Sequence, residues 1–277
     1  MTRNGVNVFD YLSEIDKQEC RLSSKEGYSD LFEHVLIQTN NLCTRKCNYC
    51  YYGNRKDEGT LYTLEDSLFY SIIDQLYELN YSGRIGLFDI NEPLTDSRIF
   101  NFIQYAKEKL PKAWHMLISN GDLLNATNVV KLFESGLDNL FISMYDDYTI
   151  AKIDKLEKDL PQYLNRINKM DFTNFDFVDN RGGNVKHKGG CETINSPCER
   201  VYKVLSIHPS GFIHSCFNDF YGVNEIGNLN EYKLIDLWNN TKFRFLRSNL
   251  DKGNRGISKL CANCNYPGKG GFFTKPK

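Results

Sequence analysis

The sequence lacks an excess of charge of either sign, and it has no long apolar run. Its 34 basic and 35 acidic residues give a formal net charge of -1, so no overall field attracts nucleic acid or an anionic membrane. No run is long enough to cross a bilayer, and residues 1–7 lack the apolar core of a signal peptide. We therefore expect a cytoplasmic protein that binds neither nucleic acid nor a membrane.

Histidine is scarce, whereas cysteine is abundant. The five histidines are scattered and show no metal-binding spacing, while nine cysteines occur in a chain of 277 residues. Because cytosolic thiols remain reduced, so many cysteines favour metal binding over a disulfide framework. A hydrophobic fraction of 41% is typical of a globular protein, and the length allows one large domain or two smaller ones.

Three of the cysteines form a short motif. Cys43, Cys47 and Cys50 are spaced Cys-x3-Cys-x2-Cys, directly after an apolar run at residues 34–40. Three thiolates can hold three irons of a [4Fe–4S] cube and leave the fourth iron open to another ligand. Structural zinc typically requires four closed ligands in two short knuckles, so this spacing favours an iron–sulfur site.

Short β-rich runs alternate with helical patterns from His34 onward. The expected strands are residues 34–40, 84–90, 114–118, 139–143 and 172–178, and the expected helices are residues 63–80, 97–110, 126–135 and 147–167. This alternation indicates parallel strands, and right-handed crossovers can curl such a sheet into a barrel. We predict an α/β fold in which residues 32–185 form a partial (β/α) barrel after an N-terminal extension, residues 1–31.

The pattern changes after this expected barrel. Residues 201–207 and 212–216 flank a Pro-Ser-Gly turn and predict a β-hairpin, and residues 233–250 predict a helix. Four cysteines in this region could enclose a second metal completely: Cys198, Cys216, Cys261 and Cys264. Their spacing alone favours zinc, because hairpins with Cys-x2-Cys are typical of zinc ribbons. We interpret residues 186–277 as a small metal-binding domain built from a hairpin and a helix.

The first motif, with Tyr49 before its last cysteine, resembles that of the radical S-adenosylmethionine (SAM) superfamily. The resemblance implies a [4Fe–4S] cluster on Cys43, Cys47 and Cys50 whose open iron binds SAM, with Tyr49 as a SAM contact. In that family, one electron from a flavodoxin- or ferredoxin-type reductant splits SAM to a 5′-deoxyadenosyl radical. The radical then removes a hydrogen atom from the substrate.

Other segments resemble the SAM-binding parts of that superfamily, and each follows an expected strand. Asn91-Glu92-Pro93-Leu94 resembles a Gly-Gly-Glu-Pro segment whose glutamate receives the SAM ammonium group, which implies this role for Glu92. Ser119 and Asn120 resemble the end of the third strand, which binds the SAM ribose and carboxylate, and Ser143 is a further candidate. In such barrels, reactive residues follow the C-terminal ends of the strands. Helix capping and turn hydrogen bonds are the alternative roles of these polar residues.

The C-terminal cysteines resemble the half-size "twitch" form of SPASM, the auxiliary-cluster domain of the superfamily. The resemblance implies a second [4Fe–4S] cluster on these four cysteines in place of zinc. Within the superfamily, the chain resembles dehydrogenases that oxidise a secondary alcohol of an aminocyclitol to a ketone and pass an electron to the second cluster. The shared segments are Asn180 to Gly183, Cys216 to Phe220, Ile226 to Asn228, Asp236 to Trp238 and Cys261 to Asn265.

This second resemblance implies a role for Arg181 in the substrate pocket. A guanidinium suits recognition of a hydroxyl group and could assist loss of the alcohol proton. Two residues depart from the pattern of those dehydrogenases. Asn218 replaces a glutamate and cannot act as a base, and Ile90 replaces a polar aromatic residue. The pocket therefore differs in polarity, and the aminocyclitol need not be the substrate here.

Three alternatives to alcohol oxidation remain open. Cys191 is not needed by the second metal site, and radical SAM epimerases use a lone cysteine to return a hydrogen atom to the substrate, although a bystander thiol is the simpler interpretation. Modification of a ribosomally made peptide is a second alternative, but the chain has little room for a peptide-recognition domain. The third alternative is an iron–sulfur or zinc protein that carries electrons or binds a partner without catalysis.

Overall fold

The computed structural model describes residues 30–54, 59–172, 180–185 and 194–269. Within them the chain forms one eight-stranded sheet with the strand order β5-β4-β3-β2-β1-β6-β7-β8. The strands are β1 (His34–Ile37), β2 (Arg84–Gly86), β3 (Trp114–Ser119), β4 (Asn139–Met144), β5 (Ile167–Asp171), β6 (Val204–Ile207), β7 (Phe212–His214) and β8 (Glu225–Asn228).

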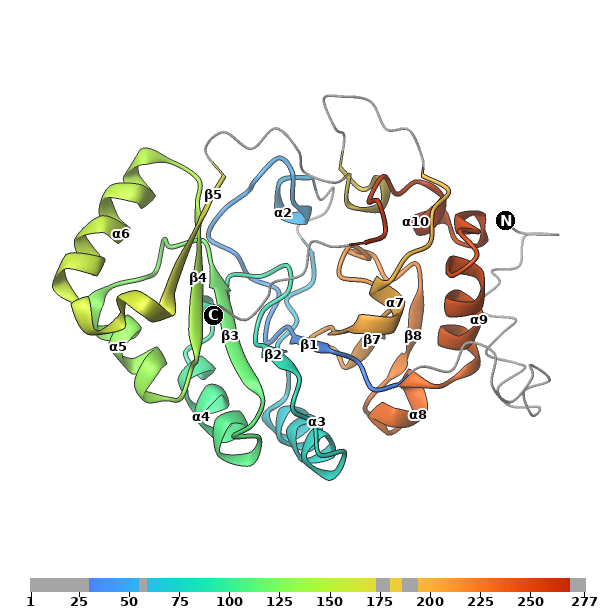
Figure 1. Cartoon of the computed structure of the whole chain (residues 1–277), viewed down its shortest axis with the longest axis horizontal. Helices are drawn as coiled ribbons and strands as arrows, with labels where there is room; N and C mark the ends of the chain where they lie inside the picture. Colours follow the sequence, from blue (N-terminus) through green and yellow to red (C-terminus); the bar gives the residue numbers. More distant parts are fainter. Residues whose placement is uncertain (1–29, 55–58, 173–179, 186–193, 270–277) are drawn as a thin grey trace.

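The first five strands are parallel, and helices connect them. The α-helices are α2 (Tyr51–Asn54), α3 (Asp66–Glu78), α4 (Ile99–Lys109), α5 (Ala126–Glu134), α6 (Asp147–Asp159), α7 (Arg200–Lys203), α8 (Leu234–Trp238), α9 (Thr241–Leu250) and α10 (Lys259–Ala262). Short 3-10 helices are η1 (Pro93–Thr95), η2 (Pro161–Arg166), η3 (Arg181–Gly183) and η4 (Arg255–Ile257). Figure 1 shows α3, α4, α5 and α6 in succession along the outside of the sheet. The predicted α/β fold is confirmed.

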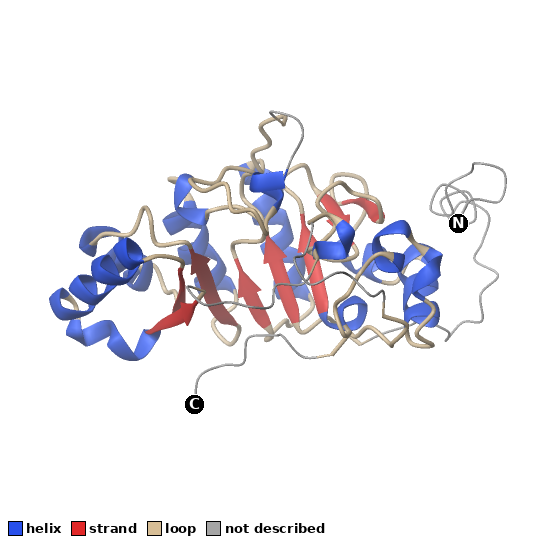
Figure 2. Ribbon diagram, turned by 90° about the horizontal axis from the view of Figure 1, so that it is seen from above, coloured by secondary structure: helices blue, strands red, loops and turns tan. Residues whose placement is uncertain are grey.

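The predicted β-hairpin is present, and it extends the same sheet. β6 pairs in parallel with β1, while β7 and β8 continue in antiparallel order. The sheet therefore passes without a break from the barrel strands to the cysteine-rich C-terminal region (Figure 2). The boundary predicted between residues 185 and 186 stays a prediction.

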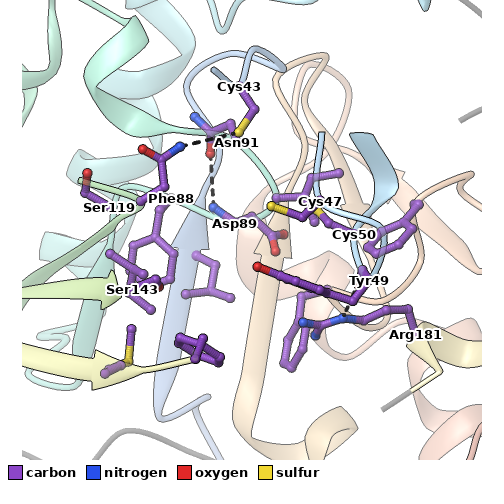
Figure 3. A pocket seen from close by; sticks show the side chains of 18 of the residues that line it. Cys43, Cys47, Tyr49, Cys50, Phe88, Asp89, Asn91, Ser119, Ser143 and Arg181 are labelled. Carbon is purple, nitrogen blue, oxygen red and sulfur yellow. Dashed lines mark hydrogen bonds between the residues drawn. The ribbon is translucent and has the colours of Figure 1, made fainter. Parts of the chain in front are cut away.

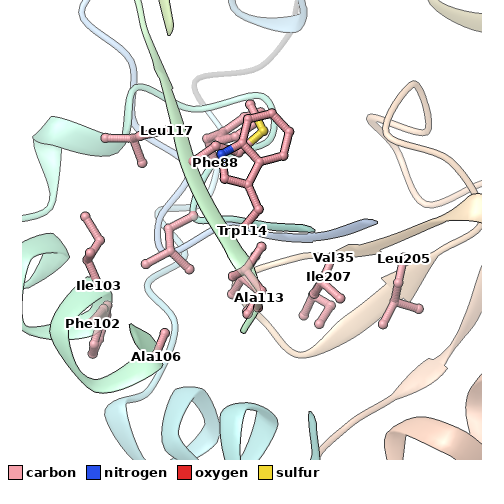
Figure 4. Close-up of a cluster of buried hydrophobic side chains, with 14 of the residues drawn as sticks. Val35, Phe88, Phe102, Ile103, Ala106, Ala113, Trp114, Leu117, Leu205 and Ile207 are labelled. Carbon is pink, nitrogen blue, oxygen red and sulfur yellow. The ribbon is translucent and has the colours of Figure 1, made fainter. Parts of the chain in front are cut away.

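The core lies between the parallel strands and the helices outside them. Every residue of β4 is buried, as expected for an inner strand of a parallel sheet that is covered on both faces. The rings of Phe69 on α3 and Phe102 on α4 stack with centroids 4.1 Å apart. Figure 4 shows Phe102, Ile103 and Ala106 of α4 on one side of this core, and Val35, Leu205 and Ile207 on the side of the C-terminal region.

The predicted boundaries of the fourth helix of the barrel and of the strand after it were wrong. The expected helix at residues 147–167 ends at Asp159, because Leu160 precedes Pro161 and leaves the helical region of backbone space at ψ 54°. The fifth strand consequently lies at Ile167–Asp171, before the expected residues 172–178, of which 173–178 lie outside the described residues.

The expected helix at residues 233–250 is divided into α8 and α9. The side chain of Asn240 accepts a hydrogen bond from the backbone N–H of Phe243 at 3.0 Å, so it caps a new helix where a continuous one was expected. Similarly, the expected strand at residues 201–207 begins as the short helix α7 and becomes extended only at Val204. Among the described helices, none has the length and apolar character needed to cross a membrane.

Candidate functional site

A cavity of about 580 Å³ extends from the first residues of β1, β2 and β6 to the segments that follow the carboxyl ends of the parallel strands. This volume is within the range of sites for small molecules and cofactors. The lining includes Cys43, Cys47, Cys50, Tyr49, Ser119, Asn120, Ser143 and Arg181, all of which were named from the sequence. Figure 3 shows side chains from several strands and from the cysteine loop around the same space.

The three cysteines of the first motif share this cavity. The backbone N–H of Cys50 donates to the carbonyl of Cys47 at 3.1 Å, which folds the loop into a turn. Burial raises the pKa of the Cys43 thiol to about 11 and also raises the pKa of Cys50, so both thiols are poor anions without a cation beside them. A bound metal reverses this preference, because a coordinating thiol is deprotonated. The thiols therefore fit a metal group that supplies positive charge.

The number of ligands in the first motif favours a cluster over one zinc ion. Within the described residues, no three histidine, cysteine, aspartate or glutamate side chains converge closely enough to hold a single ion. A [4Fe–4S] cube separates its thiolate ligands by the width of the cube, whereas zinc gathers four of them around one atom. Cys43, Cys47 and Cys50 supply the three thiolates that such a cube needs, one fewer than zinc requires.

Arg45 fastens the cysteine loop to the ends of two strands. Its Nε donates to Asp122 Oδ1 at 2.9 Å, and its Nη1 donates to Asp146 Oδ2 at the same distance. Nη2 reaches the hydroxyl of Thr149 at 2.9 Å, and the guanidinium lies 5.2 Å from the ring centroid of Tyr145. These contacts join residues that are about 75 to 105 positions apart in the sequence. Nothing in the local sequence marks Arg45 as a site residue, because its partners lie so far along the chain.

Glu92, Ser119 and Asn120 form one hydrogen-bonded cluster. Glu92 is 1% exposed, and its carboxylate accepts from the Ser119 hydroxyl at 2.9 Å and from the backbone N–H of Asn120 at 2.7 Å. Burial raises the pKa of Glu92 to about 7, although these donors oppose the rise. The side chain of Asn120 donates to the hydroxyl of Thr44 at 2.9 Å and lies 3.7 Å from the sulfur of Cys43. Polar groups expected to contact SAM therefore lie together beside the first cysteine.

Tyr49 and Ser143 face the same cavity from different sides. Tyr49 belongs to the cysteine loop, and its ring lies 5.8 Å from the ring of Tyr145, which follows β4. Ser143 is buried near the carboxyl end of β4, where it pairs in register with Met170 of β5. The loop and the strand end thus close opposite walls of one space.

Arg181 lies next to Tyr49 and Asn218. Its Nη1 is 3.4 Å from Asn218 Oδ1, and its Nε is 3.5 Å from the carbonyl oxygen of Tyr49. The backbone of Arg181 has a φ of 50°, a left-handed conformation unusual for residues other than glycine. This conformation places the side chain on the cavity wall, as Figure 3 shows. Cys191, the other residue named as catalytic, lies outside the described residues.

A second, much smaller cavity of about 30 Å³ is lined by Cys198, Cys216, Cys261 and Cys264. Backbone N–H groups are directed at two of the sulfurs, from Asn218 to Cys216 at 3.5 Å and from Tyr266 to Cys264 at 3.4 Å. Burial raises the pKa of Cys261 to about 12 and raises the pKa of Cys216 further. Hydrogen bonds to sulfur are a recurrent feature of iron–sulfur sites. The four thiols fit a closed cluster.

Two charged residues at the site were given no role from the sequence. Asp89 lines the large cavity, and Arg200 lines both cavities. The guanidinium of Arg200 lies between the rings of Phe217 and Tyr266, 4.1 and 3.4 Å from their centroids, and its Nη1 is 3.9 Å from Cys216 Sγ. Sequence offered little signal for Arg200, since its partners are distant in the chain.

Comparisons with known proteins agree with an iron–sulfur site on these cysteines. Residues 198–265 match the SPASM family, described as an iron-sulfur cluster-binding domain, and this range contains the four cysteines of the small cavity. The chain is 28% identical over 248 residues to the S-adenosyl-L-methionine-dependent 2-deoxy-scyllo-inosamine dehydrogenase of Niallia circulans, which covers 85% of this chain and 93% of the relative.

Solved structures extend the comparison to the fold. The structure of BtrN in complex with AdoMet and 2-DOIA has a TM-score of 0.76 and 26% identity, with 86% of this chain and 95% of that chain covered. The structure of anSMEcpe with bound AdoMet has a TM-score of 0.54 at 13% identity and covers 76% of this chain and 78% of that chain, a likeness of fold alone. The expected resemblance to radical SAM enzymes with a SPASM-type domain is confirmed.

Proposed function

We propose that this protein is a radical SAM oxidoreductase that oxidises a secondary alcohol of a small, cyclitol-like substrate to a ketone. One observation supports this most directly. A chain similar to an aminocyclitol dehydrogenase over 85% of its length brings Cys43, Cys47, Cys50 and Arg181 to the wall of one cavity of small-molecule size.

The reaction removes one hydrogen atom from the carbinol carbon, one proton from the oxygen and one further electron. When bound, SAM on a [4Fe–4S] cluster held by the first three cysteines supplies the radical for the hydrogen atom, and a second [4Fe–4S] cluster on the other four supplies an acceptor for the electron. We propose a flavodoxin- or ferredoxin-type protein as the reductant that starts the reaction.

The SAM-binding role is proposed for the cluster of polar residues beside Cys43. Glu92 is buried and already oriented by Ser119 and Asn120, so its carboxylate is suited to receive an ammonium group. Tyr49 and Ser143 line the same cavity and are proposed to contact SAM from the cysteine loop and from β4.

The alcohol is proposed to bind at Arg181. Its guanidinium donates hydrogen bonds in a fixed fork, which holds the alcohol oxygen and stabilises it as its proton leaves. The neighbouring Asn218, 3.4 Å away, can orient the guanidinium but cannot take a proton. The proton is therefore proposed to leave to water.

The similarity to a dehydrogenase over most of both chains favours oxidation over the other functions considered. An epimerase would need Cys191 as a hydrogen-atom donor. A peptide-modifying enzyme would need a surface for its substrate, and an electron carrier would need neither Glu92 nor Arg181.

Anaerobic reconstitution followed by reduction with SAM tests the proposal. We expect about eight irons per chain, release of 5′-deoxyadenosine, and conversion of 2-deoxy-scyllo-inosamine or a related cyclitol to a ketone. Deuterium at the carbinol carbon should appear in 5′-deoxyadenosine. Bound zinc without cleavage of SAM would contradict the proposal, and a product with an inverted carbinol centre would replace oxidation by epimerisation.

A further inference from the structure

The cavity wall carries one carboxylate among several cations. Among the described residues that line the cavity, Asp89 is the single acidic residue, whereas the cationic ones are Arg45, Arg84, Arg181, Arg200 and Lys269. A hydroxyl group of a substrate can accept hydrogen bonds from such cations, but an ammonium group only donates and requires an acceptor. Asp89 is therefore the one described residue of the wall that can pair, as an anion, with an ammonium group.

The carboxylate of Asp89 is held in place from another strand. It follows β2, and it accepts a hydrogen bond from the hydroxyl of Ser206, a buried residue of β6. Its backbone N–H donates to Asn91 Oδ1 at 3.2 Å. β2 and β6 flank β1 on its two sides, so Ser206 reaches Asp89 across the central strand. Ser206 therefore holds the side chain of Asp89, and Asn91 holds its backbone, before any substrate arrives.

Asp89 has no ion-pair partner among the described residues. Ser206 contacts its carboxylate, and burial raises its pKa to about 7 although Ser206 and the charge of Arg181 act in the opposite direction. Asp89 is only partly buried and lines the cavity, so a donor that enters the cavity can complete the hydrogen bonds of its carboxylate. Figure 3 shows Asp89 and Arg181 directed into the same space near Cys47 and Tyr49.

We propose that Asp89 is the residue that binds an amino group of the substrate, which makes the substrate an aminocyclitol or a similar aminopolyol. The ammonium group lies at Asp89, and the alcohol that is oxidised lies toward Arg181. The carboxylate and the guanidinium then orient the substrate as a pair, because each matches one end of it. This inference rests on the proposed function and adds the group by which the substrate is recognised.

The test compares two cyclitols that differ in an amino group. Substrate dissociation constants are measured by anaerobic calorimetry on the enzyme with both clusters and SAM, for 2-deoxy-scyllo-inosamine and for scyllo-quercitol, which carries a hydroxyl group in place of the amino group. We expect the wild type to prefer the amine. Asp89→Asn should weaken binding of the amine by about 10- to 100-fold and of scyllo-quercitol by less than about threefold, the effect of losing one charged hydrogen bond.

Two further variants separate recognition from a general disturbance of the protein. Ser206→Ala keeps the charge of Asp89 and removes its anchor, so we expect a smaller loss that is again confined to the amine. Asp96→Asn removes a buried carboxylate that pairs with Arg98 and does not line the cavity, and it should leave the preference unchanged.

The inference is overturned if the wild type has no preference for the amine, or if Asp89→Asn weakens both ligands equally. Failure of the proposed function has a different signature, because the wild type would then bind zinc or fail to release 5′-deoxyadenosine. An enzyme that cleaves SAM and oxidises a cyclitol without regard to Asp89 would retain the proposed function and refute this inference alone.

Discussion

The carboxylate of Glu92 accepts a hydrogen bond from the backbone N–H of Asn120 at 2.7 Å, which joins the segment after β2 to the segment after β3. The side chain of Asn120 also lies 3.7 Å from Cys43 Sγ, so Asn120 connects both segments to the cysteine loop. A change at Glu92 should therefore affect a ligand bound next to that loop more than it affects the fold.

Glu92→Gln tests this relationship. The variant keeps the size of the side chain but places an amide N–H₂ where the carboxylate now accepts, so we expect SAM affinity to fall about 10- to 100-fold. Iron content should be unchanged, since none of the cysteines is altered. Equilibrium binding of SAM to the reconstituted protein measures the effect, with Glu65→Gln, an exposed glutamate before α3, as the matched control. Equal SAM affinity in the wild type and Glu92→Gln would exclude a direct role.

The two sets of cysteines should bind their iron–sulfur clusters independently of each other. Replacement of Cys43, Cys47 and Cys50 by alanine should leave about four irons per chain and abolish SAM cleavage, because only the closed site then remains. Replacement of Cys261 and Cys264 should also leave about four irons, but cleavage of SAM should persist while product formation is lost. Iron analysis and assays for 5′-deoxyadenosine and ketone distinguish the two. Loss of all iron in both variants would contradict independent sites.

Arg45 is expected to act by positioning the cysteine loop. Arg45→Gln removes the ion pairs with Asp122 and Asp146, which should lower the free energy of unfolding by about 1–2 kcal/mol and speed loss of the first cluster to a chelator. Arg45→Lys should restore part of the cluster lifetime, since one charge remains. The control is Lys169→Gln, which removes an exposed pair with Glu157. Unchanged cluster lifetime in Arg45→Gln would refute the positioning role.

The sequence alone was sufficient to predict the cysteine sets and the order of strands and helices. The ligands of the first motif lie within eight residues, and the apolar spacing of each strand or helix is local. The signals that begin and end helices are local too, yet two helix boundaries were predicted wrongly. Pro161 ended one helix and Asn240 started another, and both signals were present but weaker than the apolar pattern.

The parts of the site that depend on distant contacts could not be predicted. The carboxylate of Asp89 is held by Ser206, 117 positions away, and Arg45 is held by Asp122, 77 positions away. Such pairs form only when the sheet brings its strand ends together, so no window of the sequence contains both members. Arg200 illustrates the same limit, because its location between the two cavities follows from the pairing of β6 with β1.

Arg200 should tune the second cluster. Its guanidinium lies 3.9 Å from Cys216 Sγ, and a positive charge near an iron–sulfur cluster stabilises the reduced, more negative state. Arg200→Gln should therefore lower the reduction potential of this cluster. Arg200→Lys should leave the potential close to the wild-type value. Potentiometric titration followed by electron paramagnetic resonance measures the shift. A higher potential in Arg200→Gln, or no shift, would contradict the argument.

His208 should make the protein sensitive to acid. It lies on the turn between β6 and β7, its ring stacks on His214 with centroids 5.4 Å apart, and the ring of Tyr62 lies 5.0 Å away. Burial lowers the pKa of His208 from 6.5 to about 4. The unfolded chain therefore binds a proton between pH 6.5 and 4 that the folded chain does not bind. As a result, the contribution of neutral His208 to stability is complete above pH 6.5 and is lost as the pH falls toward 4.

His208→Gln removes this titration. At pH 7 the variant should be less stable than the wild type, because the packed ring is lost. At pH 5 the difference in the free energy of unfolding between the two proteins should be smaller by about 2 kcal/mol. The wild type loses that much stability through His208, and the variant does not. Urea unfolding of the metal-free protein at both pH values measures the difference. Because buried carboxylates such as Glu92 respond to pH with the opposite sign and are common to both proteins, they cancel in this comparison. A difference that stays constant or widens between pH 7 and 5 would show that His208 is not held neutral by the fold.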